Sequence, residues 1–337
     1  AVLIAIDFEK AYDSVEWSAV EYALKFFNFG PRFTQWVQTF YKDINSCVIN
    51  NGHFSKFFQL QRGVRQGCPL SPYIYIIVAE LLSIMIRSDQ DIEGISINGI
   101  QYKIFQFADD TCSISRFTKR SLNAIFRAFD HFERVTGLKI NYDKTEILRI
   151  GSLRDTEAKI YTQKPVNWTN EPLLILGIYV TQSKADLFEE NFPQLLVKLQ
   201  NMCKLWTMRD LTIYGKVLIT KSLLISQLVY KLSILPTPKL EYLKEVNNII
   251  NKFVWNGKPP KIAKKILMLP LDKGGVKYSD ISIQERALKI AWVKRIIEGE
   301  NEELRNLVRL VIPDCKQAIW KANLRQSDTS KIIKNDG

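Results

Sequence analysis

The amino-acid sequence predicts an α+β fold in which a mixed first part is followed by a helical second part. In residues 1–181, short apolar or alternating runs typical of strands are separated by runs typical of helices. From residue 182 onward the apolar residues recur every three or four positions, which is the pattern of packed helices. The chain has 337 residues, enough for two or three domains with a substantial core.

The first part opens with a strand and two helices. Residues 1–8, AVLIAIDF, are short, apolar and without a helical stripe, so they predict a buried strand. A helix is expected over residues 16–29, where the Gly-Pro pair that follows would end it. Another helix is expected over residues 69–88, with Ser71 as its N-cap and Pro72 in its first position.

Residues 101–115, QYKIFQFADDTCSIS, alternate between apolar and polar positions on both sides of two aspartates. This pattern predicts a β-hairpin with Asp109 and Asp110 at its turn. A third helix is expected from about residue 121 to residue 137. Its apolar face would contain Leu122, Ile125, Phe126, Phe129 and Phe132.

The second part contains two apolar stripes that predict the packed core of a small helical bundle. The first stripe comprises Phe192, Leu195, Leu196, Leu199, Met202 and Trp206. The second, which follows Pro238 and ends near Gly257, comprises Leu240, Leu243, Val246, Ile249, Ile250 and Phe253. Residues 256–275, NGKPPKIAKKILMLPLDKGG, are basic and rich in proline and glycine, so we expect an extended linking segment there.

The positive charge is concentrated in the second part of the chain. Residues 1–150 hold 17 lysines and arginines against 16 aspartates and glutamates, whereas residues 151–337 hold 30 against 19. The net charge of +12 therefore lies almost wholly in the second part. This distribution is expected of a protein that lies along a polyanion, although a merely solubilising basic surface has the same charge.

Five scattered cysteines, none in CxxC spacing, and only two histidines argue against a zinc site and favour a reducing intracellular setting. No charge-free run of about 18 apolar residues occurs, so no membrane span is expected. The first residues resemble neither a start site nor a signal peptide, and we expect the chain to be a fragment. The cysteines are Cys47, Cys68, Cys112, Cys203 and Cys315, and the histidines are His53 and His131.

Three carboxylates are candidates for a metal site. Asp7 ends the first apolar strand, and Asp109 and Asp110 occupy the predicted hairpin turn. An Asp-Asp pair alone can be a solvated turn. If the strand lies beside the hairpin, however, the carboxylates converge, and a divalent cation would offset their repulsion. Oxygen ligands without His or Cys favour Mg²⁺ or Mn²⁺, and two such ions about 4 Å apart can promote phosphoryl transfer.

Five segments in order, AIDFEKAYD, QRGVRQGCPLSP, FADD, GLKINYDKTE and LGI, resemble palm motifs A to E of reverse transcriptases. They are most similar to those of LINE-type non-LTR retrotransposons, as is the later FVWNGKPPKIAKKILMLPLDKGGVKYSDI. The resemblance implies a right-hand polymerase with an antiparallel palm sheet in residues 1–181 and a helical thumb in 182–257. A basic, partly helical post-thumb segment would follow in 258–337.

The resemblance also implies roles for individual residues. Asp7, Asp109 and Asp110 would bind two Mg²⁺ ions, together with the backbone of Phe8, which would also line the triphosphate site. Tyr12 would be the steric gate against the 2′-hydroxyl, although core packing is the alternative. Lys144 would be the acid that protonates pyrophosphate, unless it is simply an exposed lysine. The other implied site residues are Gln66 and Gly67 at the nascent base pair and Leu176, Gly177 and Ile178 as the primer grip. Arg62 and Arg65 would contact template or phosphate, unless they are simply solvated.

The function implied is RNA-directed DNA synthesis from a DNA primer, an RNA template and deoxynucleoside triphosphates (dNTPs), in the nucleus and cytoplasm. Rival interpretations are a group II intron maturase, a viral RNA-dependent RNA polymerase, or a degenerate remnant that binds RNA without catalysis. The sequence lacks the fingers motifs and the endonuclease that precede motif A in such elements, and the Cys/His cluster often found near their C-terminus. We therefore expect the chain to bind a primer–template duplex but to extend it little.

Overall fold

The computed structural model describes residues 1–97, 99–153, 156 and 165–299. The chain forms two compact units, residues 1–184 and 185–337. The division into three domains with boundaries at residues 181 and 257 stays a prediction. Cys315 and the part of the predicted post-thumb segment from residue 300 onward lie outside the described residues.

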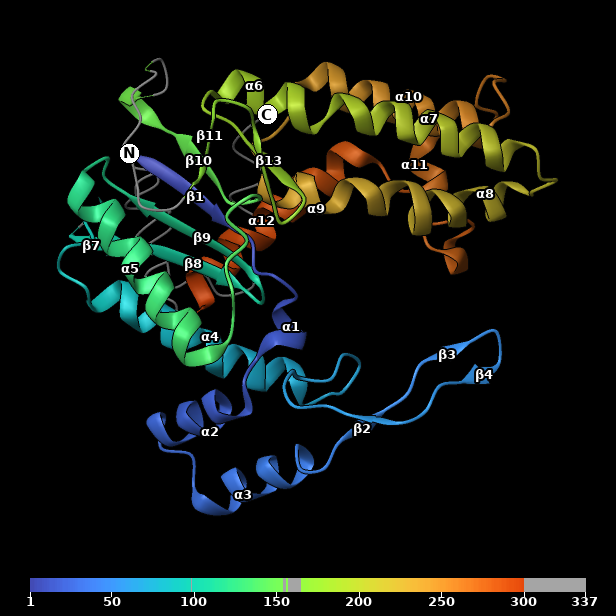
Figure 1. Ribbon diagram of the computed structural model, residues 1–337. Helices are drawn as coiled ribbons and strands as arrows, with labels where there is room; N and C mark the ends of the chain where they lie inside the picture. The colour runs from blue at the N-terminus through green and yellow to red at the C-terminus, as the bar shows by residue number, and fades with distance from the viewer. Residues whose placement is uncertain (98, 154–155, 157–164, 300–337) are drawn as a thin grey trace. The chain divides into compact units, whose positions relative to one another are not determined.

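The first unit is built on a five-stranded sheet with the strand order β11-β10-β1-β9-β8 (Figure 1). Its strands are β1 (Val2–Ile6), β8 (Ile104–Phe107), β9 (Asp110–Ser115), β10 (Glu146–Arg149) and β11 (Asn167–Thr169). Every pair is antiparallel except β10–β11. The predicted first strand is thus β1, which lies in the middle of the sheet with alternate residues buried. The sheet and its helices confirm the α+β fold class.

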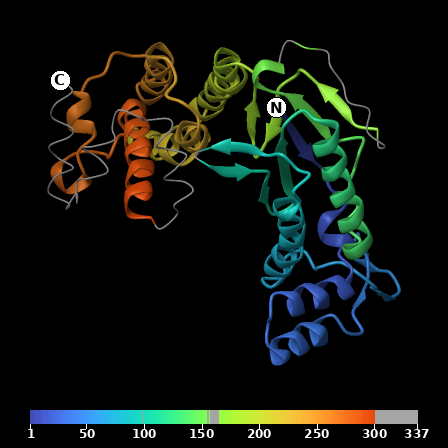
Figure 2. The same cartoon turned by 90° about the vertical axis from the view of Figure 1, so that its left-hand side faces the viewer.

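Helices α2 (Trp17–Phe26), α4 (Ser71–Ser88) and α5 (Lys119–Thr136) pack on one another and enclose the main hydrophobic core with the sheet. Figures 1 and 2 show α4 and α5 side by side. The predicted apolar face of α5 is buried, and Thr118 and Gly137 cap the helix. The cap at Thr118 explains why α5 begins two residues before its predicted start.

The predicted helix over residues 16–29 was wrong in its extent. It ends at Phe26, because Asn28 adopts a left-handed conformation with φ of 57°. Pro31, expected to end a helix, instead begins α3 (Pro31–Phe40). Proline suits a first helical position, where its missing N–H costs no hydrogen bond. The N-cap of α4 was also displaced by one residue, since Leu70 occupies that position and Ser71 is already helical.

The remaining elements of the first unit are short. They are α1 (Ala11–Ser14), the 3-10 turn η1 (Gly151–Leu153) and four two-stranded hairpins. The hairpins pair β2 (Asn45–Ser46) with β5 (Phe58–Gln59), β3 (Ile49–Asn50) with β4 (His53–Phe54), β6 (Ile95–Ile97) with β7 (Ile100–Tyr102), and β12 (Leu173–Ile175) with β13 (Ile178–Val180).

The described part of the second unit is helical, as predicted. It contains α6 (Lys184–Asn191), α7 (Pro193–Thr207), α8 (Ile213–Ile219), the π-helical turn η2 (Thr220–Ile225), α9 (Ser226–Ile234), α10 (Leu240–Val254), α11 (Lys264–Leu267), η3 (Leu271–Lys273) and α12 (Ile281–Glu298). Helix α10 packs on α7, α8 and α12, and α9 packs on α12. Both predicted stripes face this core, but Leu240 is 55% exposed at the start of α10 and Tyr242 is buried instead.

The predicted extended linker over residues 256–275 was wrong. It contains α11 and η3, and Leu267 within it is buried. The carbonyl of Leu267 accepts hydrogen bonds from the amides of Val276 and Tyr278, which folds the segment back on itself. Its prolines lie outside α11, so they do not interrupt the short helix.

Within the described residues, two helical segments are long and apolar enough to cross a bilayer, Ser71–Ser88 and Ile213–Ile234, by length and composition alone. The sequence analysis did not anticipate them because both contain charged residues. In the first segment Ile74, Val78 and Leu82 are buried in the main core, which is also what a core helix of a globular domain shows.

Candidate active site at the edge of the central sheet

The pairing of β1 with β9 brings two of the candidate carboxylates together. Ile6 lies opposite Thr111 in this antiparallel pair, so one further step of the register places Asp7 opposite Asp110. Asp109 precedes Asp110 in the hairpin between β8 and β9. The three carboxylates are therefore carried to the same end of the sheet by two neighbouring strands and one turn.

The hairpin turn lies one residue earlier than the sequence predicted. Phe107 pairs with Asp110, so Ala108 and Asp109 are the two central residues and Asp110 begins β9. Ala108 has a φ of 53°, a conformation that usually requires glycine. Backbone strain of this kind is concentrated at functional sites, where the surrounding structure holds it in place.

One carboxyl of the site has a raised pKa. The pKa of the Asp110 carboxyl is raised, first by partial burial and then by the negative charges of Asp109 and Asp7. In the described part of the chain, no three Asp, Glu, His or Cys side chains are gathered tightly enough to enclose a metal ion. The donor set of three carboxylates, without His or Cys, is nevertheless the chemical type that Mg²⁺ prefers.

Lys144 and Phe8 lie beside Asp7. The ammonium nitrogen of Lys144 is 3.9 Å from a carboxylate oxygen of Asp7, and both side chains are largely exposed. The amide of Asn141, three residues before Lys144, donates to the Asp7 carbonyl at 2.8 Å. The bridge between Phe8 and Ile140 uses this carbonyl and the amide of Glu9, and it does not use the Phe8 carbonyl.

Tyr12 is half-buried on α1 and packs against the main core. Its ring is stacked on the ring of Tyr75 from α4, with 4.7 Å between the centroids and 10° between the planes. Tyr75 in turn interacts electrostatically with Asp109. Tyr12 is therefore linked to the carboxylates through one intervening side chain. No local signal in the sequence distinguishes Tyr75, which is one of many core-facing residues on α4.

The predicted template loop, residues 61–70, is fastened to α1 by its backbone. The amide of Val64 donates to the Tyr12 carbonyl at 2.7 Å, and the amide of Gly63 donates to the Val15 carbonyl at 2.8 Å. Gly63 has a φ of 92°, and a Cβ there would lie 2.8 Å from the carbonyl oxygen of Asp13. Both the conformation and the lack of space therefore require glycine at this position. The motif QRGVRQG could have suggested this requirement.

The side chains of this loop are exposed. Gln66 donates to the Asp13 carboxylate at 3.5 Å, and Gly67 has a φ of 80° with open space around it. Arg62 forms a solvent-exposed ion pair with Glu16 at 3.8 Å. Arg65 is exposed as well. These residues share one loop, which is held to α1 by backbone hydrogen bonds at its base and by the Gln66 side chain.

The predicted primer-grip residues form the turn between β12 and β13. Leu176 and Gly177 both have positive φ values, 49° and 76°, as a type I′ turn requires. Ile178 begins β13 and is buried. This hairpin is a separate two-stranded sheet and does not extend the strands that carry the carboxylates.

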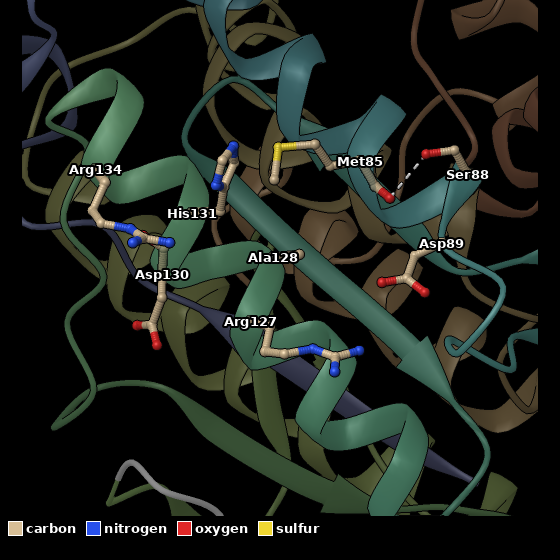
Figure 3. A pocket seen from close by; sticks show the side chains of 8 residues that line it. All are labelled: Met85, Ser88, Asp89, Arg127, Ala128, Asp130, His131 and Arg134. Carbon is tan, nitrogen blue, oxygen red and sulfur yellow. Dashed lines mark hydrogen bonds between the residues drawn. The ribbon is translucent and has the colours of Figure 1, made fainter.

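A cavity of about 580 Å³ lies elsewhere, along α4 and α5 (Figure 3). None of its lining residues is a candidate site residue, so the cavity does not coincide with the proposed chemistry. Its polar groups interact within the protein. Arg127 pairs with Asp91, Ser88 donates to the Met85 carbonyl, and Arg134 donates to the Asp130 carbonyl. The size of this cavity by itself indicates no chemistry, so the candidate active site remains the three carboxylates.

Comparison with known proteins identifies the family of this chain. The family described as reverse transcriptase (RNA-dependent DNA polymerase) matches residues 1–180. The chain is 24% identical over 306 residues to the transposon TX1 uncharacterized 149 kDa protein of Xenopus laevis, covering 88% of this chain and 22% of that protein. It is 28% identical over 139 residues to the Pol polyprotein of the type-2 retrotransposable element R2DM of Drosophila melanogaster, covering 41% of this chain and 13% of that protein.

The chain thus spans less than a quarter of the length of either relative. Among solved structures, apo telomerase from Candida tropicalis is similar at a TM-score of 0.43 and 14% identity, covering 95% of this chain and 52% of that chain. The family match extends over more than half of the sequence and covers nearly all of the first unit. The chain belongs to the reverse transcriptase family.

Proposed function

We propose that the chain is the polymerase portion of a LINE-type non-LTR retrotransposon protein and acts as an RNA-directed DNA polymerase. The observation that carries the proposal is the placement of Asp7, Asp109 and Asp110 at the same end of the neighbouring strands β1 and β9 in a reverse transcriptase family member. The reaction joins the primer 3′-oxygen to the α-phosphorus of a dNTP. The bond from that phosphorus to the bridging oxygen breaks, pyrophosphate leaves, and the 3′-hydroxyl loses its proton.

The three carboxylates and the backbone carbonyl of Phe8 would hold two Mg²⁺ ions, with Mn²⁺ as a possible substitute. When bound, the ions supply the charge that activates the primer hydroxyl and stabilises the leaving oxygen. Two features support this fit. The pKa of Asp110 is raised first by burial and then by the charges of Asp109 and Asp7, which a cation would offset, and the carbonyl of Phe8 is not used by the bridge to Ile140.

Tyr12 would exclude ribonucleotides by occupying the space beneath the sugar C2′. Its ring is held flat against Tyr75, which suits a fixed wall better than a free side chain. Gln66 and Gly67 would contact the nascent base pair from the exposed loop that is fastened to α1 next to Tyr12. The absence of a Cβ at Gly67 leaves room for nucleic acid to approach the backbone.

Lys144 would donate a proton to the departing pyrophosphate. Its ammonium group lies near Asp7, the carboxylate next to which the triphosphate would bind. Arg62 and Arg65 would contact template or phosphate, and Arg62 would exchange its exposed pair with Glu16 for that contact. Leu176, Gly177 and Ile178 would position the primer end, since a tight turn lets the backbone approach a nucleic acid closely.

The partners in this proposal are an RNA template, a DNA primer and dNTPs, and the site of action is the nucleus and cytoplasm. The basic composition of residues 151–337 supports binding to a phosphate backbone. Such binding should weaken steeply as salt increases, because each neutralised phosphate releases counterions.

The test is single-turnover primer extension by the 337-residue chain on an RNA template, with dNTPs and Mg²⁺. Asp109→Asn is compared with Asp210→Asn, an exposed aspartate on the loop after α7. Slow extension by the wild type is sufficient, because the result is the ratio between variants. The proposal predicts that extension depends on template and is lost only in Asp109→Asn. Template-dependent extension that survives in Asp109→Asn would contradict it.

A further inference from the structure

Tyr75 is a wholly buried tyrosine directly behind the proposed sugar pocket. It lies one turn into α4, has no exposed surface, and is among the largest fully buried side chains described. Its ring lies parallel to that of Tyr12 at 4.7 Å, well within stacking distance. One face of Tyr12 is therefore covered by a side chain that belongs to a long, rigid helix.

The hydroxyl of Tyr75 does not explain why a tyrosine is there. It has no hydrogen-bond partner among the described residues, although a buried polar group normally has one. The pKa of this hydroxyl is raised by burial and by the nearby Asp109 and Tyr12, so it stays protonated. Leaving a buried hydroxyl unpaired is unfavourable. The ring, and not the hydroxyl, is therefore the part of Tyr75 with an evident structural role.

The local backbone cannot fix the Tyr12 ring without help. Helix α1 has only four residues, and the hydrogen bond from Val64 holds the Tyr12 backbone but not its side chain. The stacking contact with Tyr75 covers the core-facing side of the ring and limits its rotation toward the core. Close-packed side chains shift into space vacated behind them, so loss of the Tyr75 ring would let Tyr12 retreat from the pocket.

We propose that Tyr75 is a positioning residue that sets the selectivity of the site for deoxyribonucleotides by holding the ring of Tyr12 in place. The inference rests on the proposed role of Tyr12 as the steric gate. It assigns Tyr75 no contact with substrate. Its effect passes through the stacked ring, so a variant that keeps the ring should keep selectivity even without the hydroxyl.

The experiment measures equilibrium binding of the next correct nucleotide to the 337-residue chain on an RNA template with a dideoxy-terminated primer and Mg²⁺. The blocked primer removes any dependence on turnover. The readout is the ratio of the Kd of the ribonucleotide to that of the deoxynucleotide with the same base. We compare Tyr12→Ala, Tyr75→Leu, Tyr75→Met and Tyr75→Phe, with Met included because its flexible side chain fills a core gap if Leu prevents folding.

Two control variants separate selectivity from general damage. Phe129→Leu alters an equally buried ring of the same core that packs on Phe126, and Tyr73→Leu alters a tyrosine on α4 that is 68% exposed. We expect Tyr75→Leu and Tyr75→Met to lower the ratio by about tenfold, in the direction of Tyr12→Ala, because a pocket gains room for one hydroxyl. Tyr75→Phe and both controls should leave it within about twofold.

The outcomes distinguish the inference from the proposed function. If Tyr12→Ala lowers the ratio but Tyr75→Leu and Tyr75→Met do not, the role of Tyr75 is wrong and the polymerase proposal stands. If Tyr75→Phe lowers the ratio as much as Tyr75→Leu, the hydroxyl acts and the ring-positioning account is overturned. An unchanged ratio in Tyr12→Ala would remove the gate and this inference together. Failure of the wild type to bind either nucleotide would overturn the proposed function itself.

Discussion

Two aspartates in this chain have opposite electrostatic environments. Asp280, the N-cap of α12, has a side chain that is 13% exposed, whereas Asp110 is exposed at the sheet edge. Burial alone would give Asp280 the higher pKa. The opposite is found, because burial of Asp280 is outweighed by Lys264 and by the amides of Ser282 and Ile283, so its pKa is lowered. The pKa of Asp110 is raised.

The difference separates a structural carboxylate from one that we propose is functional. At α12 the protein supplies a cation and two amides, so the charge of Asp280 is compensated within the fold. At the end of strands β1 and β9, the main charged neighbours of Asp110 are two further carboxylates, Asp109 and Asp7. A fold that keeps Asp110 beside like charges gives up stability there, which is expected where a ligand supplies the missing charge.

The largest contrast should be in catalysis. Asp109→Asn keeps the shape of the side chain and removes the charge that the metal ions need, so single-turnover extension should fall about a thousandfold. The midpoint of thermal unfolding should stay the same or rise, because repulsion is relieved. Extension above a tenth of the wild-type rate would show that Asp109 is not a metal ligand.

A stability defect should instead follow from changing the structural carboxylate. Asp280→Ala removes the N-cap of α12 and leaves Lys264 without its partner, which should cost about 1–3 kcal/mol of unfolding free energy. Chemical denaturation measures the loss. Nucleotide binding and extension per folded molecule should match the wild type. If the folded variant lost extension, Asp280 could not be a purely structural residue and the contrast with Asp110 would be wrong.

The smallest effect is a difference in the pH dependence of stability. A lowered carboxyl pKa stabilises the fold above the unfolded pKa of about 3.9, and this contribution is lost as pH falls through the folded pKa. For Asp280, the stability of wild type relative to Asp280→Asn should therefore decrease on acidification. A raised pKa acts in the reverse direction, since the folded state binds the proton more tightly.

For Asp110, the stability of wild type relative to Asp110→Asn should therefore decrease as pH rises from about 3.9 through the raised folded pKa. Urea denaturation of wild type and both Asn variants across this range, without divalent metal, gives the two slopes. Slopes of the same sign would mean that the two carboxylates do not differ as described.

The sequence predicted best what lies on regular elements. Asp7 and the FADD hairpin could be predicted because strand ends and the alternation of apolar residues are local signals. The observed turn lies only one residue before the predicted turn. Helix α3 was missed because Pro31 was interpreted as a helix end. Whether a proline follows one helix or begins the next depends on the packing of both.

Contacts between distant segments could not be predicted. The stack of Tyr12 on Tyr75, the pair of Lys144 with Asp7 and the bond of Gln66 to Asp13 each join residues far apart in the chain. Nothing in the local sequence around Tyr75 marks it among the apolar residues of α4. Such pairs are fixed by how the elements pack, which residue periodicity does not encode.

The central claim is that Asp7, Asp109 and Asp110 form a divalent-cation site. The most direct measurement is a Mn²⁺ titration followed by electron paramagnetic resonance, with the chain bound to a primer–template and the next dNTP. The account predicts that Asp109→Asn and Asp110→Asn lose Mn²⁺ that Mg²⁺ can displace from the wild type, while Asp280→Asn binds as the wild type does. Equal Mn²⁺ binding by the wild type and all three variants would contradict it.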